Sequence, residues 1–127
     1  MRLMNKRTGT AVATLVELAV TRSDRRRGLL GRDALDMSAA LVLAPCFAIH
    51  TMFMRFPIDV VFLNRDGRVR TIIRNVQPWR MVASPRAYAA VELAGGVERD
   101  LVRGDHLYLA GSGAIDLLGL PGLAGRN

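Results

Sequence analysis

The sequence has little cysteine and no long hydrophobic run, which argues against a disulfide-stabilised secreted protein and against a membrane-spanning one. Cys46 is the only cysteine among 127 residues, so the chain can form no internal disulfide, and no glycosylation sequon occurs. Charge-free stretches such as residues 37–49 contain serine or proline and fall short of the roughly 18 to 20 apolar residues of a membrane span. Residues 11–20 are interrupted by Glu17 and lack a signal cleavage site. We therefore expect a cytoplasmic protein with no membrane span.

Motifs for nucleotides and metals are also missing. No Gly-x-x-x-x-Gly-Lys-Ser/Thr loop occurs, and the glycines of residues 111–113 follow no strand and helix pattern. One cysteine and two histidines without paired spacing are too few for a closed zinc site. Cu(I) would suit the side chains that share one side of an extended segment, Cys46, His50, Met52 and Met54, but alternating methionines are typical of core packing. We predict no metal and no cofactor.

Acidic residues are in deficit. The 18 Lys and Arg exceed the 11 Asp and Glu, which gives a formal net charge of +7, and every basic residue except Lys6 is arginine. Such a charge would suit a nucleic-acid partner. However, the arginines are spread along the chain with a single run at residues 25–27, and aromatic residues interleaved with them are scarce. This pattern argues against nucleic acid and indicates a solvated, arginine-rich surface.

What the sequence does contain is a succession of short strand patterns separated by turns. With half of its residues hydrophobic, the chain can bury the core of one domain. Alternation in residues 11–20, and strand-like runs bounded by turn residues elsewhere, predict strands in residues 11–20, 41–44, 47–56, 58–63, 69–74, 79–82, 88–93 and 106–109. In residues 88–93 the Ala and Glu residues would also suit a helix. Helical signals cover only residues 25–30 and 97–102. We predict a mainly β fold, a single-domain small barrel or sandwich with one or two short helices. Its parts would be an N-terminal extension (residues 1–11), a β-rich domain (12–110) and a Gly/Leu-rich tail (111–127).

The clearest element is a hairpin whose strands flank the loop Asn64-Arg65-Asp66-Gly67-Arg68. A type I turn followed by Gly67 in the left-handed region would place Asn64 opposite Arg68 and Asp59 across from Ile73. In that register one core face would carry Asp59, Val61, Leu63, Val69, Thr71 and Ile73. A two-residue Asp-Gly turn would instead place Asp59 opposite Arg74. The sequence leaves both registers open.

Asp59 is the most informative polar residue because it interrupts an apolar strand. A buried, ionised carboxylate costs several kcal/mol unless it is paired or hydrogen-bonded. The candidate partners are Arg55, Arg74, His50 and backbone amides beside Pro57. One interpretation is a polar link that fixes the fold. The other is a carboxylate at the floor of a pocket walled by Trp79.

Residues 52–69 resemble the signature of the family known as domain of unknown function 192. Three flanking pieces agree with that family in order: residues 26–32, 91–95 and 103–107. Together these pieces span roughly residues 12–110, which is most of the chain, although Asn64 stands where the family pattern often has Asp. The resemblance implies a small, mainly β domain and no established activity.

We expect a noncatalytic domain that binds a small molecule or a protein partner in a cleft near His50, Arg55 and Asp59. The expected ligand-binding residues are Arg55, Asp59, Arg74 and Trp79. The alternative is a small hydrolase or lyase in which Asp59 or His50 is the general base and Arg55 steadies negative charge. Either hypothesis gains if His50, Arg55 and Asp59 meet in one polar concavity.

Overall fold

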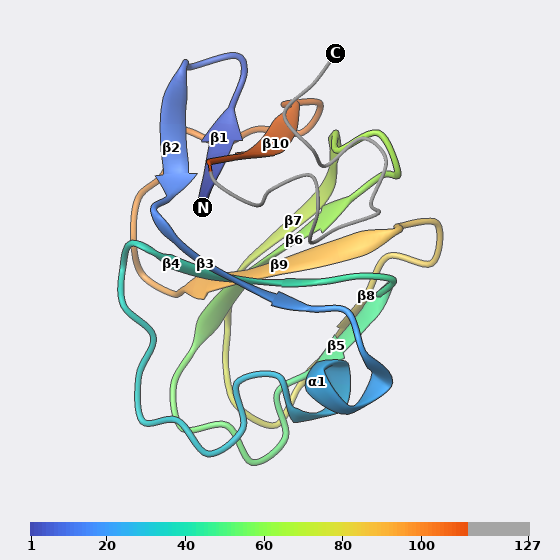
Figure 1. Ribbon diagram of the computed structural model, residues 1–127. Helices are drawn as coiled ribbons and strands as arrows, with labels where there is room; N and C mark the ends of the chain where they lie inside the picture. Colours follow the sequence, from blue (N-terminus) through green and yellow to red (C-terminus); the bar gives the residue numbers. More distant parts are fainter. Residues whose placement is uncertain (112–127) are drawn as a thin grey trace.

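The computed structural model describes residues 1–111, which form ten β-strands and one short α-helix, α1 (Arg22–Arg27) (Figure 1). The strands are β1 (Arg2–Asn5), β2 (Thr10–Ala13), β3 (Leu15–Ala19), β4 (Ala39–Leu43), β5 (Ala48–His50), β6 (Ile58–Leu63), β7 (Val69–Val76), β8 (Met81–Ala83), β9 (Ala89–Ala94) and β10 (Leu107–Ala110). This confirms the predicted mainly β class. Within these 111 residues no helix is long and apolar enough to cross a membrane.

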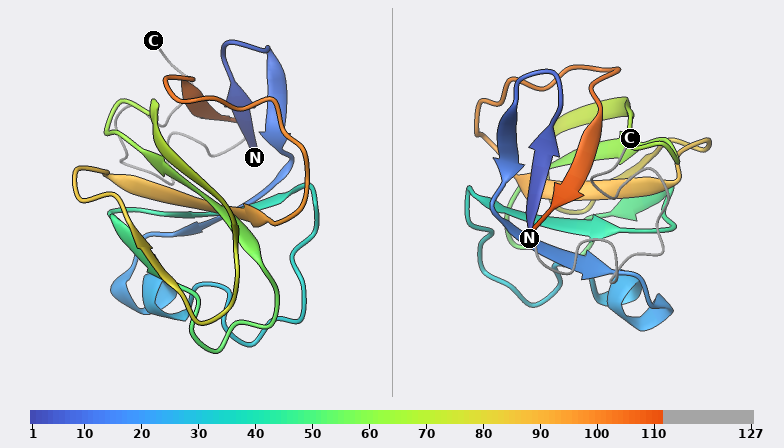
Figure 2. Two further views of the ribbon diagram at one scale, coloured as in Figure 1. Left: turned by 180° about the vertical axis from the view of Figure 1, so that it is seen from behind. Right: turned by 45° about the horizontal axis from the view of Figure 1, so that its top comes forward.

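The strands are arranged in three sheets. The central sheet has the order β3-β4-β9-β6-β7, in which only the β3–β4 pair is parallel. A second sheet, β10-β1-β2, lies over one side of it, and the ribbon β5-β8 lies on the other side together with α1 (Figures 1 and 2). The sheets do not close into a barrel. Of the two predicted forms, barrel and sandwich, the layered sandwich is therefore the one that agrees with the structure.

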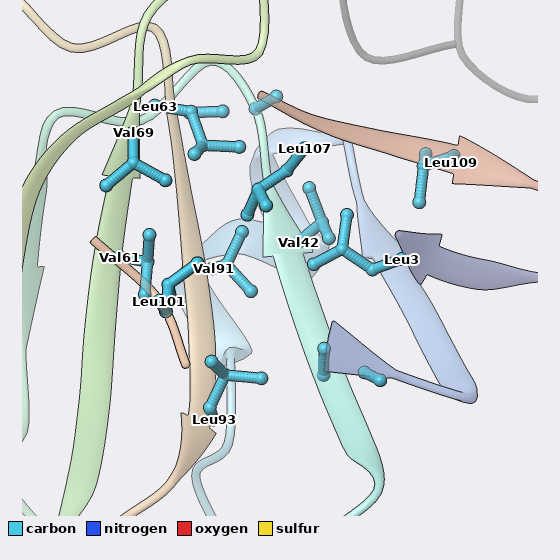
Figure 3. Packing of buried hydrophobic residues seen from close by; sticks show 14 residues of the cluster. Leu3, Val42, Val61, Leu63, Val69, Val91, Leu93, Leu101, Leu107 and Leu109 are labelled. Carbon is cyan, nitrogen blue, oxygen red and sulfur yellow. The ribbon is translucent and has the colours of Figure 1, made fainter. Parts of the chain in front are cut away.

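Both faces of the central sheet are covered, so β6 and β9 are buried at every position. One core lies between the central sheet and β10-β1-β2 and includes Leu3, Val61, Val91 and Leu107 (Figure 3). The other lies on the side of α1 and β5 and includes Leu29, Ile49, Val60 and Phe62. Successive side chains of β6 therefore enter different cores. The expectation of one core face on this strand does not hold, because a second layer covers the face that was expected to be outward.

The hairpin of β6 and β7 uses both predicted registers in turn. Next to the loop, Leu63 pairs with Val69, and the Asn64 amide donates to the Arg68 carbonyl at 2.8 Å. Gly67 has a φ of 88°, as the three-residue loop requires. Irregularities in the ladder then shift the pairing, so that Val60 faces Ile73 and Asp59 has no direct partner on β7.

Tertiary contacts move several of the predicted boundaries. The pattern of residues 11–20 is divided between β2 and β3, where the chain passes from the second sheet to the central one. Residues 47–56 contribute only β5, and residues 97–102 form no helix. Helix α1 begins after Thr21, whose hydroxyl accepts the Asp24 amide at 3.0 Å, and it ends at Gly28, whose φ is 47°.

Residues 1–11, predicted as an extension, carry β1 and the start of β2 and belong to the packed structure. Leu3 is fully buried, and β1 lies between β2 and β10. Buried Asp105 ties this hairpin to the loop before β10, because it accepts hydrogen bonds from Arg7 Nε at 2.6 Å and from Asn5 Nδ2 at 2.9 Å. Apart from Gly111, the predicted tail lies outside the described residues.

Candidate functional site

Asp59 is buried in β6, and both of its carboxylate oxygens have partners. Oδ2 accepts from Arg99 Nη1 at 2.8 Å, and Oδ1 accepts from the Asn75 amide at 2.8 Å. The Arg99 side chain is only 8% exposed, and its Nη2 also donates to the Ala94 carbonyl at 2.9 Å. Burial lowers the pKa of Arg99 from its ordinary value, and Asp59 opposes this effect. This ion pair joins β6, β7 and the loop after β9, which is the arrangement of a structural link.

The partner of Asp59 was missed in the sequence because it lies 40 residues away in the chain. The candidates Arg55, Arg74 and His50 are engaged elsewhere or face away from it. Arg74 donates to the Leu101 carbonyl at 3.0 Å, and Arg55 forms an exposed ion pair with Asp33. No local pattern marks Arg99, since the loop of residues 95–101 meets the irregular part of β6 only in the folded sheet.

The residues predicted to share a cleft are dispersed in the structure, and Arg55 lines neither the hollow beside Asp59 nor the pocket beside His50. Asp59 and Arg74 border one hollow with Arg99, whereas His50 lines a different pocket beneath α1. Trp79 is exposed and its ring packs on Phe53, with the two centroids 4.6 Å apart. The structure therefore does not bring His50, Arg55, Asp59 and Trp79 together around one concavity.

The pocket beneath α1, here called the α1 pocket, has a volume of about 340 Å³. It lies between α1, the segment that joins β4 to β5, and β5 itself. Its apolar walls include Leu29, Leu43, Ile49 and Met54, while its polar lining includes Arg22, Arg26, Cys46, His50 and Glu92. Ligand sites in proteins commonly combine such apolar walls with a few polar groups.

Glu92 is the unusual feature of the α1 pocket. It lies on β9 in the middle of the central sheet, with Leu41 and Val60 as its neighbours across the ladders. The side chain is buried on the side of α1, and its Oε1 has no hydrogen-bond partner. Burial raises the pKa of Glu92 from 4.5 to about 7, against a smaller opposing effect of Arg32. A carboxyl group that titrates near neutral pH thus lines a pocket.

The rim of the α1 pocket is basic because α1 places three arginines on one face. Arg22, Arg25 and Arg26 are related by steps of three and four residues, the spacing of neighbours on a helix surface. Arg25 donates to the carbonyls of Val20 and Ala44. Among the described residues, the side chains of Arg22 and Arg26 have no hydrogen-bond or ion-pair partner, so their guanidinium groups are available to an anion.

The α1 pocket gives little support for a nucleophilic cysteine or a metal site. Burial, with a smaller effect of Glu92, raises the pKa of the Cys46 thiol, so it is held as the unreactive thiol at neutral pH. Within residues 1–111 no group of three or more His, Cys, Asp and Glu residues is placed to hold a metal ion.

Sequence reasoning missed Glu92, although the same signal that marked Asp59 was present. Glu92 interrupts the apolar residues of 88–93, where a carboxylate also needs a partner or a raised pKa. The arginine run of residues 25–27 was predicted to lie on a solvated surface. That the arginines of α1 line the same pocket as Glu92 depends on the packing of α1 against the central sheet.

Comparison with known proteins agrees with the fold and provides no activity. A crystal structure of a protein of unknown function from Novosphingobium aromaticivorans DSM 12444 is 21% identical and has a TM-score of 0.75, with 86% of this chain and 84% of that chain covered. A "putative transcription regulator" from Sinorhizobium meliloti 1021 is 28% identical and has a TM-score of 0.71, with 84% of this chain and 88% of that chain covered. No curated protein matches the chain. The chain belongs to the DUF192 family, described as "Uncharacterized ACR", whose profile matches residues 3–109.

Proposed function

We propose that this DUF192 protein binds a small amphipathic anion in the α1 pocket and does not transform it. The ligand's acidic group would face Arg22 and Arg26, its apolar body would lie between Leu29 and Ile49, and a hydroxyl or amine would reach Glu92. His50, which lines the same pocket, would contribute at the rim. Asp59, Arg55, Arg74 and Trp79 are not part of the proposed contact.

The observation that carries this proposal is the unpartnered Oε1 of Glu92 in the pocket lining. Buried polar atoms in native proteins nearly always have a partner, because an unsatisfied one costs about 1 to 3 kcal/mol. The β9 backbone holds Glu92 in place, and no described side chain satisfies this oxygen. A donor supplied by a ligand would satisfy it.

The arginines give the proposal its direction. Arg22 and Arg26 bring two positive charges to one end of the pocket, whereas the walls between them and the sheet are hydrocarbon. A ligand with an acid at one end and a hydrogen-bond donor at the other matches both features. The pocket volume lies at the lower end of the roughly 300 to 1,000 Å³ typical of small-molecule sites.

The hydrolase or lyase alternative has weaker support. That alternative makes Asp59 or His50 the general base, which must be placed to take a proton from a bound substrate. Both oxygens of Asp59 are occupied by Arg99 and Asn75, and His50 lies at an exposed rim without an orienting acid among the described residues.

The test uses three matched probes on the full-length protein: ω-hydroxy carboxylates of six to ten carbons, the corresponding simple carboxylates, and the corresponding diols. Calorimetric titration should rank the hydroxy carboxylates first, and bound ligand should raise the melting temperature. The double variant Arg22→Ala/Arg26→Ala should weaken the binding of both carboxylate series and leave the binding of the diols unchanged. Glu92→Leu should remove the advantage of the hydroxyl group, because leucine offers no hydrogen-bond acceptor.

Arg103→Ala supplies the control, since Arg103 is exposed and lies outside the α1 pocket. Equal loss of carboxylate binding in this variant would mean that general charge, not the pocket, attracts the anion. Absence of binding by all three probe series would remove the proposal.

A further inference from the structure

A second feature, independent of the α1 pocket, is a cluster of exposed apolar side chains on neighbouring segments. Among residues 1–111, four of the nine exposed large hydrophobic residues belong to residues 52–53 and 79–81: Met52, Phe53, Trp79 and Met81. The two segments lie side by side because His50 pairs with Met81 and the Trp79 amide donates to the Thr51 carbonyl at 3.0 Å. We call these four residues the aromatic patch.

The backbone holds the aromatic patch outward at a cost. Phe53 and Trp79 have φ values of 66° and 67°, a region that bulky side chains rarely adopt. Their side chains are nevertheless exposed, at 69% and 57%, so packing in the core does not explain the conformation.

Thr51 supplies the constraint that keeps this conformation. It is fully buried, and its amide donates to the Arg80 carbonyl at 2.8 Å. Its hydroxyl donates to the Gln77 carbonyl at 2.6 Å and accepts the Arg80 amide at 2.9 Å, while its carbonyl accepts the Met54 amide at 3.1 Å. A rigid hub of hydrogen bonds thus presents two rings and two thioethers to the outside.

The two segments that form the aromatic patch carry basic residues and no acidic ones. Residues 50–56 and 77–83 contain no Asp or Glu, and their arginines are Arg55 and Arg80. Asp33 pairs with Arg55, but Arg80, which separates Trp79 from Met81, has no acidic partner among the described residues. An occupant of this surface must therefore combine apolar character with negative charge.

We propose that the aromatic patch docks the protein on an anionic lipid bilayer. Trp and Phe are favoured at the boundary between acyl chains and headgroups, and arginines beside them gain from the negative surface potential of anionic lipids. A bilayer accepts side chains that project from turns without needing a matching pocket. Nucleic-acid bases fit less well, because the Phe53 and Trp79 rings are tilted by 57° against each other and offer no parallel faces for a base.

Trp79 is the only tryptophan in the chain, so its fluorescence reports on the aromatic patch directly. The full-length protein is titrated with vesicles of phosphatidylcholine alone and with vesicles containing about one third phosphatidylglycerol, a strongly anionic surface. With the anionic vesicles, but not with pure phosphatidylcholine, we expect a blue shift of the tryptophan emission and co-sedimentation of the protein. High salt should reverse both effects. Met81→Ser and Arg80→Gln should each weaken vesicle binding about tenfold, as loss of apolar area or of one charge predicts.

Met37→Ser is the matched control, because Met37 is 69% exposed and Met81 is 67% exposed. Arg103→Gln controls for charge in the same way. An equal effect of the control substitutions would overturn the proposal, as would an unchanged emission with anionic vesicles. A blue shift or quenching with an oligothymidylate, or with an acidic protein, and none with vesicles would assign the patch to that partner instead. Binding of ω-hydroxy carboxylates in the α1 pocket is measured separately, so either proposal can fail alone.

Discussion

Replacing Glu92 by Gln should remove a pH dependence of stability that originates in the α1 pocket. Gln has nearly the same shape and keeps a side-chain oxygen, but it cannot ionise. Both the native carboxyl and the amide occupy the same buried place on β9, between β4 and β6. Differences in packing or hydrogen bonding between the two proteins then appear as a constant offset, whereas ionisation appears as a slope with pH.

The magnitude follows from the pKa of Glu92, which burial raises from 4.5 to about 7. Below pH 4.5 the group is protonated in both the folded and the unfolded chain, so it imposes no charge penalty. As the pH rises from about 4.5 to about 7, the unfolded chain releases the proton first, and the free energy of unfolding of the wild type falls. The total loss is about 3 kcal/mol, at about 1.4 kcal/mol per pKa unit, and it levels off above about pH 7.

Urea denaturation of both proteins at intervals from about pH 4.5 to about pH 8 measures this difference. The free energy of unfolding of Glu92→Gln minus that of the wild type should increase by about 3 kcal/mol across that range. Asp105 titrates below this window, since its pKa is lowered to about 2, and it does not distort the comparison. Parallel curves for the two proteins, or a wild type that gains stability relative to the variant, would refute the view that Glu92 is desolvated and unpaired.

Three further substitutions test the links that hold the sheets together. Asp59→Asn should lower the free energy of unfolding by about 3 kcal/mol, because it leaves the buried Arg99 charge unpaired, and Asp59→Asn/Arg99→Met should recover part of that loss in urea denaturation. Gly95→Ala should destabilise by about 1 to 3 kcal/mol, because the new Cβ would lie 3.0 Å from the Pro57 carbonyl carbon and oxygen; an unchanged urea midpoint would contradict this close approach. Asp105→Asn should remove stability that the wild type has above pH 3.8 and loses as the pH falls towards about 2, since the hydrogen bond from Arg7 lowers the pKa of Asp105. Acid denaturation followed by circular dichroism measures the last effect, and identical acid transitions in the two proteins would count against it.

Local sequence information was sufficient for the strand class and for the strongest turn. The residue order of 88–93 favoured a strand over a helix and predicted β9, and the Asn-x-Asp-Gly loop predicted the hairpin of β6 and β7. Turn chemistry acts over four or five residues, so its signal is contained in the sequence. It could not choose one register because the ladder shifts on the way from the loop to Asp59.

The sequence predicted which type of residue matters, a buried carboxylate, but not its partner or the pocket. A carboxylate in an apolar strand was correctly recognised as needing a partner, and Asp59 has one in Arg99. Which carboxylate remains unpartnered could not be read locally, because Asp59 and Glu92 both interrupt apolar strands. The difference depends on the folded chain: the loop of residues 95–101 places Arg99 beside Asp59, whereas Glu92 lies in the pocket beneath α1.

The amino-acid order alone thus determined a small β domain of the DUF192 type, because periodicity, turns and family signature are properties of neighbouring residues. Only the tertiary structure decided which polar groups meet: it buried Arg99 against Asp59, left Glu92 alone beneath α1, and exposed Trp79 on a rigid turn. These outcomes depend on contacts between residues distant in the chain, whose pairing energies have no counterpart in a local pattern.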